Sequence, residues 1–453
     1  MSKTTDMTVG RTVPLLLRFA APLILTNLGQ QLYMIVDSAI VGRGVGVRAL
    51  AAVGATDWSY WLVLWAVIGL TQGFSTFISR YFGEGSLRKM NEVVAASATL
   101  TAVVGAVASL LAVLLARPLL LLLGTPTDIL PGAVTYFTTM AAGILVVAAY
   151  NMAAAVLRAL GDGRTPLLAM GIAALLNVGL DLLFVLVFGL GLFGAALASL
   201  LSQLVSFLFC LFRIRGIDCV RIVRRELLPS RARARELLGF GLPLALQNTV
   251  ISLGGMILQS TINREGSTFI AGFTATNKLY GLLESTALSL GAAAATFLAQ
   301  NYGAKRYDRV REGVRYGLLL SVGAALLVGA VVLPLRRPLL SLFLDTRDAE
   351  AAAALLVGER YLTVMLLSLV SLYLIHLYRN ALQSVGVARF SMLSGLAEFF
   401  MRVVIAKLVI RATGADVLYF VEPIAWIAAL LFVIPPYYAI ARRRLRAPTN
   451  TDI

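Results

Sequence analysis

Long apolar runs, separated by short segments rich in glycine, proline and arginine, recur along the whole chain. Each run has the length of about 20 residues that a helix needs to cross a hydrocarbon layer of about 30 Å. The pattern therefore predicts an all-α polytopic membrane protein with twelve transmembrane helices. The runs lie at 13–40, 49–77, 92–116, 130–156, 165–188, 192–213, 236–262, 268–299, 314–334, 353–377, 388–410 and 418–440.

The second half of the chain repeats the pattern of the first. The stretch LLLRFAAPLILTN at 15–27 returns as ELLGFGLPLALQN at 236–248, and VLRALGDGR at 156–164 returns as ALQSVGVAR at 381–389. A spacing that stays near 220–225 residues over both halves is typical of an internal duplication. Because six spans is an even number, we expect two pseudo-symmetric six-helix lobes in the same orientation, a plan that transporters use.

Basic residues orient this arrangement. They gather in the loops on the side of the N-terminus, among them Arg379 and Arg389. The bias predicts that both termini lie in the cytoplasm and that the protein lies in the cell membrane. It also explains the net charge of +16 without nucleic acid as a partner. We expect an N-terminal lobe at 1–212, a basic cytoplasmic linker at 213–235, a C-terminal lobe at 236–443 and a cytoplasmic tail at 444–453.

Composition limits the chemistry. The chain is 59% hydrophobic and only 14% charged, which a water-soluble core could not accommodate. Its two cysteines, Cys210 and Cys219, and its single histidine, His376, show no metal-ligand spacing. We therefore expect no metal site, no catalytic residues and no enzyme activity.

Polar residues inside the spans carry the functional hypothesis, because a carboxylate within a membrane is costly. Asp37 ends a polar face of the first span, and Asn177 and Asp181 lie one helical turn apart in the fifth. Asn151 and Ser199 offer further oxygens in neighbouring spans. We expect these residues to bind a proton or a hard cation such as Na⁺. The alternative is that they only hold helices together.

Further residues have candidate roles in the spans. Pro22 lies inside the first span and permits a bend there. Glu398 and Arg402 are four residues apart and predict a structural ion pair. Asp57 and Lys278 occupy equivalent places in the two repeats and are a candidate gate, unless Lys278 extends to lipid headgroups. The candidate substrate-cavity residues are Asn27, Gln30, Tyr33, Met34, Gln247 and Asn248.

Several motifs together resemble the multidrug and toxic compound extrusion (MATE) transporter family. They are MIVDSAIVGR at 34–43, RALGDGRTP at 158–166, GAALASLLSQ at 194–203 and AQNYGA at 299–304, and they occur in the family's order. The resemblance covers nearly the whole chain. It implies two six-helix lobes around a central cleft, ion-linked roles for the first-lobe carboxylates, and a bend at the proline of the first span.

The resemblance also implies a function. Members of this family export organic cations or other amphipathic compounds in exchange for H⁺ or Na⁺, by alternating access. One branch carries acidic residues in spans seven and ten, where this chain has Gln247 and Asn248 in the seventh and no Asp or Glu in the tenth. The chain therefore resembles the DNA-damage-inducible or archaeal-type branch more closely, with coupling in the N-terminal lobe.

Other expectations follow from the same reasoning. The expected partners are small amphipathic or cationic substrates, H⁺ or Na⁺, and membrane lipids. We expect no cofactor apart from Na⁺ as a candidate coupling ion. We also expect the protein to be a monomer. A flippase for a lipid-linked precursor, from the wider superfamily, is the alternative function. Such proteins tend to have a cationic cavity. The first lobe of this chain is acidic, which disfavours the flippase alternative. A channel is a further alternative that the sequence leaves open.

Overall fold

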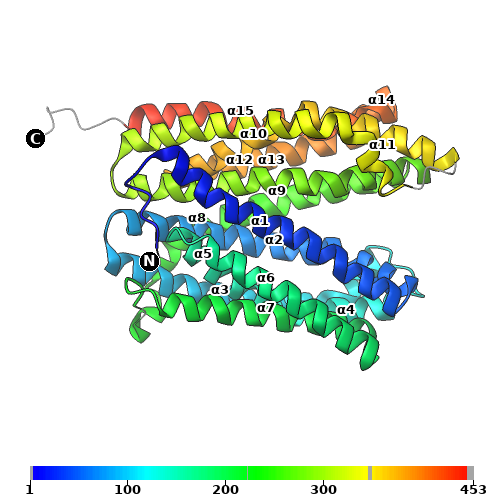
Figure 1. Ribbon diagram of the computed structural model, residues 1–453, viewed down its shortest axis with the longest axis horizontal. Coiled ribbons are helices and arrows are strands. Elements are labelled where there is room, and N and C mark those ends of the chain that lie inside the picture. Colours follow the sequence, from blue (N-terminus) through cyan, green and yellow to red (C-terminus); the bar gives the residue numbers. More distant parts are fainter. Residues whose placement is uncertain (1–3, 222, 345–348, 446–453) are drawn as a thin grey trace, which may run out of the picture. The chain divides into compact units, whose positions relative to one another are not determined.

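The computed structural model describes residues 4–221, 223–344 and 349–445, and within these ranges every regular element is a helix (Figure 1). Most of the expected tail at 444–453 lies outside the described residues. The elements of the first half are α1 (Thr12–Gly44), α2 (Val47–Gly83), α3 (Leu87–Leu122), α4 (Leu130–Ala142), α5 (Ile144–Ala159), α6 (Arg164–Asp181), η1 (Leu182–Val187), α7 (Gly191–Arg215) and η2 (Arg224–Leu227).

The second half follows the same order through its sixth α-helix and the π-helical turn after it, and then has two further short elements before its last helix. Its elements are α8 (Arg231–Ile262), α9 (Ser267–Gly303), α10 (Tyr307–Ser341), α11 (Ala349–Leu367), α12 (Leu369–Ser384), α13 (Ala388–Val404), η3 (Ile405–Val409), α14 (Ile410–Thr413), η4 (Ala415–Phe420) and α15 (Val421–Arg444). In the first half η1, and in the second half η3, is a π-helical turn that continues the preceding helix, α6 or α13.

The helices account for the expected spans. Among the described residues, nine helices are long and apolar enough to cross a membrane, and the total is eleven when each of the bent pairs α4–α5 and α11–α12 is counted as one span. The remaining expected span, 388–410, is α13 continued by η3 and α14. The chain is therefore a multi-pass helical membrane protein, as the apolar pattern predicts.

Two of the spans contain helix breaks that the apolar pattern of the sequence does not predict. The helix axis turns by 44° between α4 and α5, at Gly143, and by 48° between α11 and α12, at Ser368. At Gly143 an added Cβ would lie only 2.0 Å from Leu200 Cδ2 in α7, so glycine allows α7 to pack against the break. The two breaks fall at equivalent places in the two halves, so the duplication extends to irregular backbone.

The connecting turns repeat as well. Gly46 and Gly266, 220 residues apart, both have positive φ before a long helix. Gly85 has φ 74°, and Lys305, also 220 residues later, has φ 57° and is the only described non-glycine residue with a positive φ. Backbone geometry thus confirms the internal repeat even where the residue type has changed.

The chain divides into two compact units. Among the described residues, the first unit contains those from Leu25 to Ala245 together with those before Thr8, and the second contains Thr8–Ile24 and those from Leu246 onward. Helices α1 and α8 each contribute to both units, whereas the sequence pattern assigns each helix to a single lobe. The change of unit comes two residues after a proline in both helices, Pro22 in α1 and Pro243 in α8.

Each unit has its own apolar core. In the first unit, α2, α3, α4 and α7 pack around buried residues such as Phe137 and Leu120. In the second unit, α9 is the central helix and packs along α10, α11 and α12 (Figure 1). There Phe273 and Tyr361 stack with their ring centroids 3.9 Å apart, and Trp426 is 1% exposed. These cores hold α7, α12 and α15, which carry several of the polar residues described next.

Candidate functional site

A polar cluster lies inside the first unit, where α1, α6 and α7 bring their side chains together. The Tyr33 and Ser199 hydroxyl oxygens are 3.0 Å apart, and Asn177 Nδ2 donates to Ser199 Oγ at 3.3 Å. Asn177 is fully buried and Ser199 is 5% exposed. Three of the expected site residues are thus joined in one hydrogen-bonded chain.

Two carboxyl groups complete the cluster. Asp181 is fully buried one turn after Asn177 on α6, and it interacts electrostatically with the Asp37 carboxyl group on α1. Four buried oxygen atoms have no donor among the described residues: both carboxylate oxygens of Asp181, Oδ1 of Asp37 and Oδ1 of Asn177. Two ionised carboxylates cannot donate to each other, so the pair is unsatisfied without a proton or a cation.

This arrangement has a definite chemistry. An unpaired buried carboxylate costs several kcal/mol in a low-dielectric surrounding, roughly in proportion to its loss of hydration. One shared proton would let one carboxyl group donate to the other, and a hard cation would satisfy several of the oxygens at once. The cluster contains acceptors in excess and no basic side chain, so it is built to take up positive charge.

The other expected members of the site are placed less directly. Asn151 donates Nδ2 to the carbonyl of Val147 in its own helix at 2.9 Å, so its association with the carboxylates stays a prediction. Asn27, Gln30 and Met34 are half-buried on α1, at helical spacing from Asp37. Pro22 lies within α1, which runs as one helix from Thr12 to Gly44.

The second unit holds a different polar feature, which we call the ionic network. Its members are Arg379 on α12, Glu398 and Arg402 on α13, and Glu422 on α15, and each is at most 9% exposed. Arg379 Nη2 lies 2.6 Å from Glu398 Oε1, and Arg402 donates to both oxygens of Glu422, at 3.0 and 2.7 Å. With two positive and two negative members, the network is neutral as a whole.

The network changes the interpretation of several residues. The expected pair of Glu398 and Arg402 lies at 3.5 Å, but each has a closer partner elsewhere. Arg379 was expected in a cytoplasmic loop and is instead buried in α12, because Glu398 compensates its charge. Gln247 lies against the network: in the amide orientation that satisfies both neighbours, its oxygen accepts from Arg379 Nε at 3.3 Å and its nitrogen donates to the Ser391 carbonyl. Asn248, next to it, is half-buried.

The remaining intramembrane charges have separate positions. Asp57 on α2 belongs to the first unit and Lys278 on α9 to the second, and both are exposed, so their role as a gate stays a prediction. Glu284 on α9 lies 4.0 Å from His376 Nε2 on α12, a contact that sequence spacing could not reveal. Within the described ranges, no group of three or more His, Cys, Asp or Glu side chains could hold a metal ion.

Comparison with known proteins agrees with this architecture. The profile of the MatE family matches residues 22–183 and 243–408. The chain is 31% identical over 360 residues to the probable multidrug resistance protein YpnP of Bacillus subtilis (strain 168), which covers 80% of both chains. It is 28% identical over 333 residues to an FAD transporter of Shewanella oneidensis, which covers 71% of both.

A solved structure shares the fold over nearly the full length. It is described as the outward-facing conformation of a multidrug resistance MATE family transporter of the MOP superfamily. Its TM-score is 0.90 at 22% identity, with 98% of this chain and 100% of that chain covered.

Proposed function

Because this chain belongs to the MatE family of transporters and is not an enzyme, we propose that it is a secondary antiporter. In this proposal it exports organic cations or other amphipathic compounds in exchange for H⁺ or Na⁺, by alternating access. The first unit binds the coupling ion through Asp37 and Asp181, with Asn177, Ser199 and Asn151 around them. No cofactor takes part.

One observation carries the proposal. The buried oxygens of Asp37, Asn177 and Asp181 have no donors within the described part of the chain. A buried acceptor is normally paired, so four together are a strong departure from ordinary packing. Residues that only hold helices together would be expected to satisfy one another across the helix contact. The cluster therefore supports a role in taking up and releasing a cation.

The coupling step follows from charge. When a cation or proton binds, the repulsion between the two carboxylates is relieved and α1 can pack against α6 at low cost. When the ion leaves, the carboxylates are again uncompensated and favour a state in which water or substrate reaches them. A cationic substrate and the coupling ion would thus compete for the same negative charge, which is the basis of exchange.

The substrate class rests on the chemistry of the site and on the relatives. YpnP is named as a probable multidrug resistance protein, and the Shewanella oneidensis relative as an FAD transporter. We favour organic cations because the cluster is acidic, and a lipid-linked pyrophosphate precursor is disfavoured for the same reason. Asn27, Gln30, Tyr33 and Met34 are the candidate substrate contacts on α1. We further propose a monomer in the cell membrane with both termini cytoplasmic.

Transport in vesicles tests the proposal. The protein is reconstituted in liposomes in which the proton and sodium gradients are set independently, and export of a cationic dye is followed by fluorescence. We expect one of the two gradients to drive export and Asp181→Asn to abolish it. The matched control is Asp128→Asn, since Asp128 is exposed in the turn before α4 of the same unit.

Two results of this assay would contradict different parts of the proposal. Gradient-driven export that persists in both Asp181→Asn and Asp37→Asn would show that the acidic cluster is not the coupling site. Export that neither gradient drives would show that the protein is not an antiporter of this kind.

A further inference from the structure

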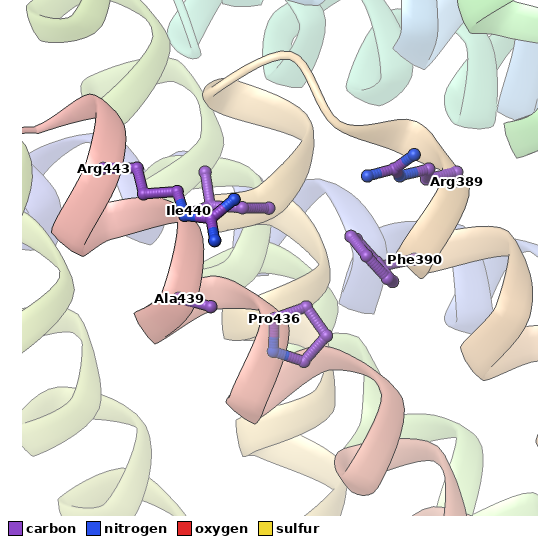
Figure 2. A pocket seen from close by; sticks show the side chains of 6 residues that line it. All are labelled: Arg389, Phe390, Pro436, Ala439, Ile440 and Arg443. Carbon is purple, nitrogen blue, oxygen red and sulfur yellow. The ribbon is translucent and has the colours of Figure 1, made fainter.

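A pocket in the second unit lies apart from both the acidic cluster and the ionic network. It forms where the start of α13 meets the end of α15, and it has a volume of about 190 Å³ (Figure 2). The residues that line it are Arg389, Phe390, Pro436, Ala439, Ile440 and Arg443. Nothing in the proposed transport cycle uses this pocket.

The polar part of the pocket is wholly basic. Arg389 and Arg443 are its only charged lining residues, and Figure 2 shows their guanidinium groups reaching toward each other from the two helices. The Arg389 guanidinium also lies 4.8 Å from the centre of the Phe390 ring, which restricts its orientation. The first turn of α13 adds backbone N–H groups that favour an anion near Arg389.

The framework around the arginines is anchored. Arg444 donates to the Val385 carbonyl at 3.3 Å, and Arg311 donates to the Leu445 carbonyl. These bonds fix the end of α15 relative to the end of α12 and to α10. The backbone that carries Arg443 is therefore held in place, although its side chain is exposed.

The rest of the lining is apolar. Phe390, Pro436, Ala439 and Ile440 form the wall between the two arginines and the hydrophobic part of α15. A ligand that matches this lining needs an anionic group at one end and an apolar chain at the other. Basic pockets between helices at the cytoplasmic ends of transmembrane spans are suited to the headgroups of anionic phospholipids.

We propose that this pocket binds an anionic phospholipid of the cytoplasmic leaflet. The lipid phosphate lies between Arg389 and Arg443, and one acyl chain follows Phe390, Pro436 and Ile440. This inference does not depend on the transport function, because it concerns only binding by the second unit, but the choice of leaflet rests on the proposed cytoplasmic position of the termini.

Binding is measured on the full-length protein by native mass spectrometry, in detergent with added phosphatidylglycerol or phosphatidylcholine. We expect a preference for phosphatidylglycerol, and the double variant Arg389→Gln/Arg443→Gln to weaken its binding about 30-fold, as expected for the loss of two basic residues near a lipid phosphate. The matched control is Arg442→Gln, because Arg442 is an exposed neighbour on the same helix that does not line the pocket. It should change binding less than twofold.

A second variant tests the apolar part. Ala439→Phe fills the pocket without removing a charge, and it should also weaken phosphatidylglycerol binding, with an unchanged size-exclusion profile. Equal binding of phosphatidylcholine, or full retention of binding in the double variant, would overturn the proposal. Displacement of the lipid by millimolar inorganic phosphate alone would also overturn it, since the pocket would then be a simple phosphate site.

Discussion

The ionic network of the second unit makes a strong prediction about stability. Arg402 is 6% exposed, donates two hydrogen bonds to Glu422 and a third to the Ile251 carbonyl at 3.1 Å, and lies 3.5 Å from Glu398. Replacing it by methionine preserves most of its volume but leaves Glu422 as a buried charge without compensation. Removing one partner of a buried ion pair typically costs about 3–5 kcal/mol. We therefore expect Arg402→Met to lower the folded-to-unfolded ratio by roughly two to nearly four powers of ten.

The reverse single change should be similarly costly. Glu422→Gln leaves the network with two arginines and one glutamate, so one positive charge is uncompensated. In the double variant Arg402→Met/Glu422→Gln the remaining charges, Arg379 and Glu398, are paired at 2.6 Å. Because neutrality is restored, the double variant should be less destabilised than the sum of the two single variants by at least about 2 kcal/mol.

A double-mutant cycle measures this coupling. The wild type, the two single variants and the double variant are unfolded by heat or denaturant in the same detergent. Tryptophan fluorescence follows the unfolding transition, which gives the free energy of unfolding of each protein. If each single variant costs less than about 1 kcal/mol, or if the two costs simply add, the charges do not depend on each other as the geometry requires.

Three further predictions concern backbone and topology. Gly69→Ala should destabilise the first unit by about 2 kcal/mol or more in a thermal unfolding assay, because its Cβ would lie 2.6 Å from the Leu244 carbonyl oxygen. The control is Gly54→Ala on the same helix, which meets no atom within 4 Å and should be neutral in that assay. Lys305→Gly should raise stability by about 0.5–1 kcal/mol, since Lys305 holds a positive φ; a lower unfolding temperature would contradict this. Burial raises the pKa of the Cys219 thiol, so its labelling by a membrane-impermeant maleimide should be slow at neutral pH and should increase with pH as the thiolate forms. Labelling rates over a pH series check this, and the label should react only from the cytoplasmic side; labelling from outside would refute the proposed orientation.

Much of the fold can be predicted from the sequence because the membrane imposes long apolar helices. The spans, the duplication and the acidic residues of α1 and α6 all follow from spacing along the chain. The breaks at Gly143 and Ser368 cannot be read this way. An apolar run has the same appearance whether the helix is straight or bent, and the partner that packs against the break at Gly143 is Leu200, which is distant in sequence.

The polar sites show the same limit. Spacing reveals that Asn177 and Asp181 share a face of one helix, but it does not reveal that Tyr33 meets Ser199, 166 residues away. Helical spacing pairs Glu398 with Arg402, yet the shorter contacts of both residues are to other helices. An arginine at the end of an apolar run resembles a loop residue, and only the tertiary structure identifies a buried counter-charge.

The repeated backbone turns have a consequence for how such a protein can specialise. Gly85 and Lys305 have the same left-handed backbone conformation although only one of them is a glycine. The backbone conformation has therefore been kept in both halves while the residue type has changed. Two identical subunits would have to carry every carboxylate and every ion pair twice. Fusion into one polypeptide removes that constraint, and each half can acquire its own electrostatics: unsatisfied acceptors in the first half, and a neutral ionic network in the second.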